Sequence, residues 1–191
     1  SPIKDQAAYE AKLAMTREFL RPDARVLEIG CGTGSTAISH APYAAHILAT
    51  DVSEEMIEIA RDKAATAGLE NVDFATVSAE ALSLPERSLD MVMAHSILHL
   101  VDDYETVLAQ AHRWLKPGGL LVTSTPCLSD MVPWLRFVAP VARLVRLFPP
   151  TLRFFSEERL RASLQSQGFT IERRYRPGPK AAVFIIARKA G

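Results

Sequence analysis

The sequence contains little cysteine, no surplus of charge of either sign and no long apolar run. Its two cysteines, Cys31 and Cys127, lie far apart, which excludes a disulfide framework and a cysteine-rich metal site. We therefore expect a reducing, cytoplasmic setting and no bound metal. No run of about 18 apolar residues is present, so we expect neither a transmembrane segment nor a secretory leader.

The charge balance argues against nucleic acid as a partner. The chain has 22 Lys and Arg against 22 Asp and Glu, whereas a protein that binds nucleic acid normally carries a basic excess that neutralises phosphates. Apolar residues make up 48% and charged residues 23% of the 191 positions, as in an ordinary globular protein. We expect one domain over residues 1–191 and a small molecule as partner. Nothing in the sequence predicts the oligomeric state.

Short apolar strands alternate with helices from the start of the chain to about residue 125. Strands are expected over 25–29, 45–50, 72–77, 89–94 and 120–125. Helices are expected over 5–20, inside an N-terminal segment 1–22, and then over 33–40, 54–67 and 104–115. Ser53 is the expected N-cap of the third helix, and Met56 is expected to face inward from it. This alternation is typical of a mainly parallel sheet covered on both faces.

The order of elements changes toward the C-terminus. An apolar, arginine-containing segment over 127–155 precedes a helix over 156–167, for which Ser156 is the expected N-cap. Two strands, over 169–175 and 181–187, follow with a short proline- and glycine-containing connection. Such a connection requires an antiparallel hairpin, because a parallel crossover needs a dozen or more residues.

Residues 26–34 read Val-Leu-Glu-Ile-Gly-Cys-Gly-Thr-Gly, an apolar strand that breaks into three alternating glycines. Glycine lets a ligand approach the backbone where a Cβ would block it. The next expected strand leads directly to Asp51, whose carboxylate can accept hydrogen bonds from ribose hydroxyls. This arrangement indicates a nucleotide-binding site.

The spacing of the glycines separates two kinds of nucleotide. The dinucleotide fingerprint is G-x-G-x-x-G, with the pyrophosphate at a helix N-terminus. Here the glycines are Gly30, Gly32 and Gly34, and Ser35 stands at the position of the third fingerprint glycine. The pattern therefore favours a ligand without a pyrophosphate.

Two other side chains in this turn need an explanation. Glu28 falls near the end of a strand buried on both faces, where an unpaired carboxylate costs several kcal/mol. Either a structural partner satisfies it or it takes part in the ligand site. Cys31 is best interpreted as a small apolar filler between the glycines, because no histidine is adjacent to activate it.

Five segments in matching order resemble the class I S-adenosylmethionine-dependent methyltransferases, in the small-molecule branch that includes the ubiquinone and menaquinone methyltransferases. The resemblance runs from about Arg25 to Pro126, and its segments begin at Val26, Thr50, Ser78, Pro85 and Leu115. It implies a Rossmann-like three-layer α/β sandwich. The implied sheet has seven strands in the order 3-2-1-4-5-7-6, with strand 7 antiparallel and a helical insertion after strand 5. It also implies S-adenosylmethionine as methyl donor and S-adenosylhomocysteine as product.

The resemblance assigns cofactor contacts to residues of these segments. The matched positions are Glu28, Gly30, Cys31, Gly32 and Gly34 in the glycine turn that holds the methionine part, Asp51 for the ribose, and Val52, Met56, Ser78, Ala79 and Glu80 around the adenine. Many members have aspartate where this chain has Ser78, and a serine hydroxyl accepts the adenine amino group more weakly. His95 falls where the family often places a residue beside the amino-acid end of the cofactor.

The residues after the fourth expected strand bear on the acceptor. His99 could act as a general base for an acidic hydroxyl, or it could be a satisfied histidine at a helix start. No Asn-Pro-Pro-Tyr or Asp-Pro-Pro-Tyr follows this strand, which argues against amino-group methylation of adenine or glutamine. Cys127 follows Pro126 after the fifth strand rather than the fourth, so we do not expect it to be a nucleophile.

The segment Met131–Phe155 is expected to select the acceptor. It contains apolar residues, no carboxylate, and the arginines Arg136, Arg143, Arg146 and Arg153. Three interpretations stay open: a lid over a hydrophobic pocket, a helix on an anionic membrane surface, and a core helix with solvated arginines. The first makes the insertion over 127–155 a substrate element.

We therefore predict an enzyme that moves a methyl group from S-adenosylmethionine to a small, apolar-bodied acceptor by in-line displacement. Two alternatives remain. One is a cofactor-binding module without catalysis. The other is an NAD(P)-dependent oxidoreductase. That class predicts the third glycine of the dinucleotide fingerprint and a Tyr-Lys or Ser-Tyr catalytic set, and the sequence shows neither.

Overall fold

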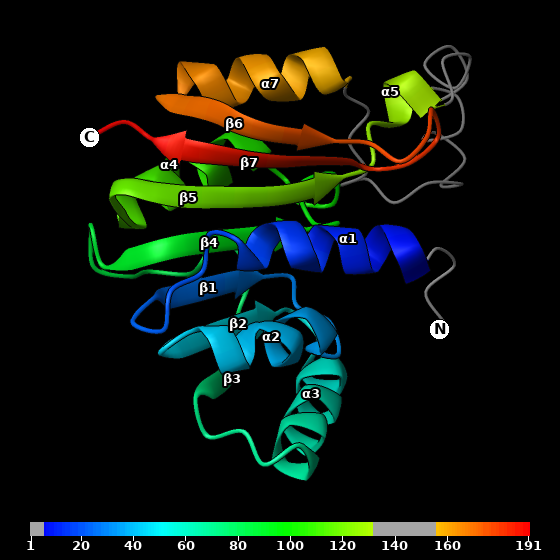
Figure 1. Cartoon of the computed structure of the whole chain (residues 1–191). Coiled ribbons are helices and arrows are strands. Elements are labelled where there is room, and N and C mark those ends of the chain that lie inside the picture. The colour runs from blue at the N-terminus through cyan, green and yellow to red at the C-terminus, as the bar shows by residue number, and fades with distance from the viewer. Residues whose placement is uncertain (1–5, 132–155) are drawn as a thin grey trace.

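The computed structural model describes residues 6–131 and 156–191 (Figure 1). Their centre is a seven-stranded sheet in the order β3-β2-β1-β4-β5-β7-β6. The strands are β1 (Arg25–Ile29), β2 (His46–Asp51), β3 (Val72–Thr76), β4 (Leu89–His95), β5 (Leu115–Thr125), β6 (Phe169–Tyr175) and β7 (Val183–Lys189). This order confirms the topology that the resemblance implied.

Strand direction divides the sheet into two parts. The neighbours from β3 to β5 pair in parallel, whereas β7 runs antiparallel to both β5 and β6. The predicted C-terminal hairpin is therefore confirmed. Because β1, β2 and β4 are parallel neighbours, their carboxyl ends lie at the same edge of the sheet, where open α/β sheets bind ligands.

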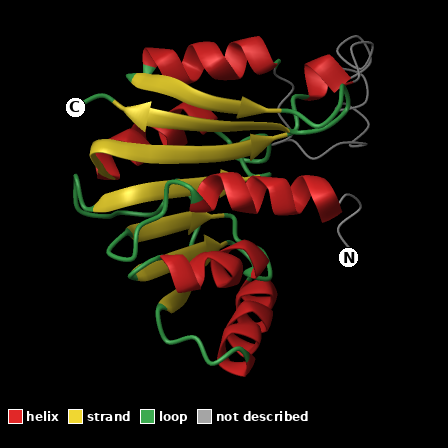
Figure 2. Ribbon diagram, in the orientation of Figure 1, coloured by secondary structure: helices red, strands yellow, loops and turns green. Residues whose placement is uncertain are grey.

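Helices cover both faces of the sheet, which confirms the expected three layers (Figure 2). They are α1 (Gln6–Arg17), α2 (Ser35–His40), the 3₁₀ helix η1 (Ala41–Tyr43), α3 (Glu54–Thr66), α4 (Tyr104–Trp114), α5 (Leu128–Met131) and α7 (Glu157–Ser166). One core cluster joins α2 and α3 to the sheet, with α1 packed against its margin. A second cluster joins α4 and α7 to the opposite face.

Residues of β1 contribute to both clusters, which explains its continuous apolar sequence. Val26 belongs to the first cluster, whereas Leu27 and Ile29 belong to the second, and all three are at most 1% exposed. A strand buried on both faces of a parallel sheet carries such an uninterrupted apolar run. This burial fixes the position from which the glycine turn begins.

Side-chain caps set the starts of three helices. The hydroxyls of Ser53 and Ser156 accept backbone N–H bonds at the starts of α3 and α7, as predicted. Asp103 does the same with two N–H groups at the start of α4. Such caps contribute about 1 kcal/mol each.

One element boundary differs substantially from the prediction. Strand β5 begins at Leu115, not at residue 120, because Leu115 already pairs with Leu89. The pairing then shifts register and continues at Leu120 opposite Met91. Residues 116–119, which lie between the expected helix and the expected strand, therefore form an irregularity inside β5, where Gly118 has a positive φ of 76°.

Most of the predicted insertion over 127–155 lies outside the described residues. Its described part comprises the approach to α5 and that short helix. Within the described parts of the chain, none of the helices has the length and apolar character needed to cross a membrane.

Candidate functional site

The turn between β1 and α2 brings three glycines close to other parts of the chain. Gly30, Gly32 and Gly34 all have positive φ, at 69°, 52° and 71°. A Cβ on Gly30 would lie 2.8 Å from the Ile97 side chain, whereas a Cβ on Gly32 would meet nothing within 4 Å. The backbone at Gly32 therefore faces open space, so a ligand could approach it closely.

Asp51 at the end of β2 is bound to the backbone on both sides. One carboxylate oxygen accepts from the Gly32 amide at 2.8 Å, and the other accepts from the Ser53 amide at 3.0 Å. Each carboxylate oxygen has lone pairs beyond the one used here. The turn therefore orients a carboxylate that retains the capacity to accept bonds from ligand hydroxyls.

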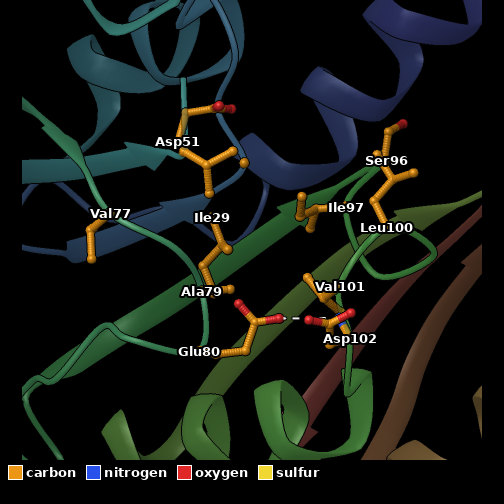
Figure 3. A pocket seen from close by; sticks show the side chains of 12 residues that line it. Ile29, Asp51, Val77, Ala79, Glu80, Ser96, Ile97, Leu100, Val101 and Asp102 are labelled. Carbon is orange, nitrogen blue, oxygen red and sulfur yellow. Dashed lines mark hydrogen bonds between the residues drawn. The ribbon is translucent and has the colours of Figure 1, made fainter. Parts of the chain in front are cut away.

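A cavity of about 380 Å³ opens beside Asp51, and we call it the glycine-turn cavity (Figure 3). Its lining residues are Ile29, Gly30, Asp51, Val52, Val77, Ala79, Glu80, Ser96, Ile97, Leu100, Val101 and Asp102. The sidewalls are mainly aliphatic, and Val52 and Leu100 are 69% and 41% exposed. Glu80 accepts a bond from the Asp102 amide across the far side of the cavity at 3.2 Å. A flat apolar group with a hydroxyl-bearing sugar would match this lining.

Five of the predicted cofactor residues line this cavity: Gly30, Asp51, Val52, Ala79 and Glu80. The aliphatic residues after β4, including Ile97, Leu100 and Val101, were missed. Their only signal was their position between His95 and the α4 helix, where aliphatic side chains look like ordinary core residues.

Glu28 lies beneath the turn and is only 2% exposed. Its Oε2 atom has no hydrogen-bond partner among the described residues. Burial raises the pKa of this carboxyl to about 8, with the charge of Asp51 acting in the same direction and the Ala37 backbone amide opposing it. The carboxyl is therefore largely protonated at neutral pH, which removes most of the expected cost of burying a charge. It does not line the glycine-turn cavity.

The two cysteines are buried thiols rather than nucleophiles. Burial raises the pKa of Cys31 to about 12, and the nearby Glu28 and Asp51 add to that shift. Burial likewise raises the pKa of Cys127 to about 12. Both thiols stay protonated at neutral pH, and a thiol in that state is a poor nucleophile.

Two residues predicted around the adenine, Met56 and Ser78, do not line the glycine-turn cavity. Met56 was expected to face inward from α3, but it is 38% exposed, so that prediction is wrong. Residues Ile57 and Ala60 bury the inner face instead. The Ser78 hydroxyl accepts a bond from the Ala81 amide at 3.2 Å, so it already supports the turn after β3.

His95 ends β4 and lines a second cavity of about 210 Å³, which we call the α1 cavity. Its lining residues are Tyr9, Lys12, Thr16, Thr36, His95, Ser96 and Ser124. The His95 ring stacks on Phe184 with the ring centroids 6.4 Å apart. Burial lowers the pKa of His95 to about 3, and the charges of His40 and Lys12 act in the same direction. This imidazole is therefore neutral at physiological pH.

His99, the predicted general base, lines neither cavity. Its side chain is half-buried, and its Nδ1 atom has no hydrogen-bond partner in the described part of the chain. Burial lowers the pKa of His99, so the ring is neutral at pH 7. The structure brings it to the same loop as Leu100 but not to the wall of the glycine-turn cavity.

Comparisons with known proteins agree with this geometry. A family model described as a methyltransferase domain matches residues 26–119. Among curated proteins, the uncharacterized methyltransferase YcgJ of Bacillus subtilis is 35% identical over 99 residues, covering 52% of this chain and 39% of that protein. The ubiquinone biosynthesis O-methyltransferase of Sinorhizobium fredii is 38% identical over 101 residues, 53% of this chain and 40% of that protein.

A third curated relative extends the match. The demethylmenaquinone methyltransferase of Geobacillus kaustophilus is 36% identical over 120 residues, covering 60% of this chain and 51% of that protein. The chain thus spans about two fifths to one half of the length of these three relatives.

Solved structures match over nearly the whole chain. The YcgJ structure from Bacillus subtilis superposes with a TM-score of 0.78 at 21% identity, covering 95% of this chain and 99% of that one. An S-adenosylmethionine-dependent methyltransferase from Mesorhizobium loti gives 0.79 at 22% identity, with 97% and 99% covered. These likenesses show the fold, and the sequence matches show a methyltransferase domain over residues 26–119. Together the findings support a class I S-adenosylmethionine-dependent methyltransferase, with S-adenosylmethionine as cofactor.

Proposed function

We propose that this chain transfers the methyl group of S-adenosylmethionine to a small, apolar-bodied acceptor by in-line displacement. The observation that carries the proposal is the carboxylate of Asp51. Backbone amides of Gly32 and Ser53 hold it at the rim of a largely aliphatic cavity of about 380 Å³. A nucleoside offers the matching groups: ribose hydroxyls for the carboxylate and an aromatic base for the aliphatic wall.

Each wall of the glycine-turn cavity then has a role. Asp51 accepts from the ribose hydroxyls. The exposed side chains of Val52 and Leu100 cover the adenine faces, and the backbone of Ala79 lies beside its edge. The methionine part continues along Gly30 and the open backbone at Gly32, with the remaining turn residues supporting that path.

Methyl transfer requires the protein mainly to position the donor and the acceptor. The sulfonium sulfur of the donor is already a good leaving group, so the bond from the acceptor to the methyl carbon forms as the sulfur–carbon bond breaks. Bringing donor and acceptor to near-attack distance and excluding water can supply roughly 7–11 kcal/mol. A general base is needed only when the acceptor must lose a proton. His99, which is neutral, stays a prediction for that role.

The acceptor class rests on the relatives. Their printed names place one in ubiquinone biosynthesis as an O-methyltransferase and name another as a demethylmenaquinone methyltransferase. We propose an acceptor of comparable, apolar-bodied chemistry for this chain. The arginine-containing segment over 131–155, predicted to select it, lies almost wholly outside the described residues, so its lid, membrane and core interpretations all remain predictions.

The second candidate function is cofactor binding without methyl transfer. One solved structure with this fold, at a TM-score of 0.79 and 22% identity, covers 99% of this chain and 83% of its own and is described as the [4+2]-cyclase SpnF. The fold therefore does not by itself require methyl transfer. No comparison reported above supports the oxidoreductase alternative. Ser35 stands where the dinucleotide fingerprint has its third glycine, and its hydroxyl accepts a hydrogen bond from the Lys63 ammonium at 2.7 Å.

The test is calorimetric binding of S-adenosylhomocysteine to the wild type and to Asp51→Ala. Loss of hydrogen bonds to a charged group is worth about 1.5–3 kcal/mol, so we expect the affinity to fall about 10- to 100-fold. Asp73→Ala is the matched control, because Asp73 is exposed on β3 and pairs with His46 away from the cavity. Binding of NADH in place of S-adenosylhomocysteine, or unchanged affinity in Asp51→Ala, would contradict the proposal.

A turnover assay distinguishes a methyltransferase from a protein that binds the cofactor without transferring its methyl group. The wild type is incubated with methyl-labelled S-adenosylmethionine and a panel of phenolic and quinol acceptors. A labelled product that extracts into organic solvent supports methyl transfer to an apolar-bodied acceptor. Binding of the cofactor without any labelled product favours the non-catalytic module.

A further inference from the structure

His40, the last residue of α2, is fully buried although it lines neither the glycine-turn cavity nor the α1 cavity. Its Nδ1 atom lies 2.9 Å from the Thr36 carbonyl one turn earlier, and its Nε2 atom has no hydrogen-bond partner among the described residues. A buried polar atom without a partner is uncommon in a native structure. A buried imidazole also loses hydration that its charged form needs, so protonating this ring in place is unfavourable.

The His40 ring lies where α1 meets α2. Helix α1 packs beside α2 on the same face of the sheet (Figure 1). The guanidinium of Arg17 donates to the Ser39 carbonyl at 3.1 Å. The backbone carbonyl of Leu13 comes near enough to the His40 ring to favour its charged form. Helix α1 therefore contributes to the burial of the ring.

The charged side chains that act on this ring are cations. Arg17 of α1 opposes the protonation of His40. His95, at the end of β4, and His40 oppose the protonation of each other, and Lys12 of α1 acts on His95 in the same sense. Among the described residues, no carboxylate shifts the pKa of His40, and only two backbone carbonyls favour its charged form. Burial chiefly, and the charge of Arg17 in addition, lower the pKa of His40 from its ordinary value of 6.5.

Helix α1 is held by a small apolar area. Its buried residues are Ala8, Leu13 and Thr16, and Leu13 is the only large apolar one of the three. Met15 is partly buried against the margin of the core. Local opening costs least free energy where few buried apolar contacts are lost. Because the sheet is formed by strands alone, the release of α1 would break no strand pairing.

We propose that α1 is a proton-released cover: acid charges the His40 imidazole, the ring turns to solvent, and α1 leaves α2 while the sheet stays folded. The ring takes its proton from the solvent and returns it when the pH rises. Because Tyr9, Lys12 and Thr16 of α1 line the α1 cavity, the release opens that cavity to solvent. The glycine-turn cavity, to which α1 contributes no residue, stays in place. This device does not rest on the proposed function.

The direction of the pH dependence follows from the two states of His40. When α1 is released, the exposed ring titrates near its ordinary pKa of 6.5, whereas burial lowers that pKa when α1 is docked. Above pH 6.5 the ring is neutral in both states and has no effect on docking. Below pH 6.5 the released state binds the proton first, so docking weakens as the pH falls, by at most about tenfold per pH unit. His95, whose pKa burial lowers to about 3, stays neutral between pH 5 and pH 7.5.

Hydrogen–deuterium exchange at pH 7.5 and pH 5, corrected for intrinsic exchange rates and read by mass spectrometry, tests the proposal. In the wild type we expect the protection of the α1 amides to fall by up to about 30-fold, because pH 5 lies about 1.5 units below the pKa of an exposed imidazole. The amides of β4 and β5 should keep their protection. His40→Asn retains a donor for the Thr36 carbonyl, and His40→Phe fills the space of the ring. Neither variant should show the fall.

His46→Asn is the matched control, because His46 is a partly exposed histidine of β2 that bonds to Asp73 of β3. It should respond to acid as the wild type does. The proposal is overturned if α1 keeps its protection in the wild type, if β4 and β5 lose theirs together with α1, or if a folded His40 variant responds like the wild type. Thermal unfolding at pH 7.5 shows which variants are folded, and the wild type can overturn the proposal without them. The exchange experiment uses no ligand, so its outcome is independent of whether the nucleoside binds.

Discussion

The glycine-turn cavity and the α1 cavity adjoin at Ser96 yet have opposite chemistry. The first is walled mainly by aliphatic side chains and is lined by the acidic residues Asp51, Glu80 and Asp102. The second is walled by hydroxyls and carries the ammonium of Lys12. The first is shaped by the backbone of a turn, whereas the second is assembled from side chains of α1, α2 and the ends of two strands. The second cavity therefore depends on the docking of α1, whereas α1 contributes no residue to the first.

The largest expected effect comes from substitutions in the glycine turn. We expect Gly34→Ala to act mainly on stability and Gly32→Ala mainly on ligand binding. A Cβ on Gly34 would lie 2.7 Å from Phe74 and 2.9 Å from Ala60, and its φ is positive. We expect Gly34→Ala to lower the free energy of unfolding by about 2–5 kcal/mol, from backbone strain and overpacking together. Gly32→Ala meets no neighbour, so we expect a loss of about 1–2 kcal/mol from strain alone.

Urea unfolding measures these two losses, and calorimetry measures S-adenosylhomocysteine binding. Gly32→Ala should remain folded but bind the nucleoside weakly, because its methyl group enters the open space beside Asp51. Equal losses of stability in the two variants, or undiminished binding in Gly32→Ala, would show that the turn does not shape the first cavity as described.

The second prediction concerns Glu28, the acidic group beneath the turn. Its pKa is about 8 in the folded chain against 4.5 for an ordinary glutamate, chiefly through burial. Between these values the folded state keeps the proton that the unfolded state loses, so stability falls as the pH rises, by up to about 1.4 kcal/mol per pH unit. Below pH 4.5 both states are protonated and the dependence disappears.

Glu28→Gln replaces the carboxyl with a neutral group of the same shape. We expect it to match the wild type near pH 4.5 and to become progressively more stable than the wild type as the pH rises to 8. Urea unfolding at pH 5, 6.5 and 8 measures the difference. Parallel profiles for the two proteins would mean that Glu28 is ionised and paired in the folded state, and that a buried negative charge lies beneath the glycine turn.

The same contrast explains which part of the site could be predicted from the sequence. The glycine turn and Asp51 lie close together along the chain, and glycine at a positive φ leaves a visible spacing, so Gly30, Asp51 and Val52 could be placed beside one cavity. The α1 cavity draws Tyr9, Thr36 and Ser124 from distant segments. Single hydroxyl residues in helices and strands carry no such spacing, so their assembly appears only in the fold.

The roles of the two histidines could not be predicted from their chemistry alone. His99 stood out because an imidazole can exchange a proton near pH 7, and His95 stood out because of its position at the end of the fourth expected strand. In the structure burial lowers the pKa of both. His95 lines the α1 cavity, whereas His99 lines neither that cavity nor the glycine-turn cavity. The fold topology was more predictable, because alternating apolar strands and helices constrain it over many residues. The start of β5 was not, since a glycine-containing bulge inside a strand has the same local sequence as a turn.

The smallest expected effect concerns Val52, which is 69% exposed on the wall of the glycine-turn cavity. Val52→Ala removes apolar surface that a nucleoside base would cover. 5′-Methylthioadenosine has the nucleoside of S-adenosylhomocysteine but lacks the amino acid. We expect the dissociation constants of S-adenosylhomocysteine and 5′-methylthioadenosine to rise by the same factor, at most about 15-fold, which corresponds to roughly 0.8 kcal/mol for each of the two methylene equivalents removed. Unfolding should change by less than about 0.5 kcal/mol, because the side chain is already in water.

Ile59→Ala is the matched control for Val52→Ala. Ile59 lies on α3, is 40% exposed and lines neither cavity, so its truncation should leave both dissociation constants unchanged. An equal effect of Val52→Ala on the two nucleosides would place Val52 against the part that they share. A selective loss of S-adenosylhomocysteine binding would instead place the amino-acid end against Val52, and the glycine-turn cavity would then not hold the base.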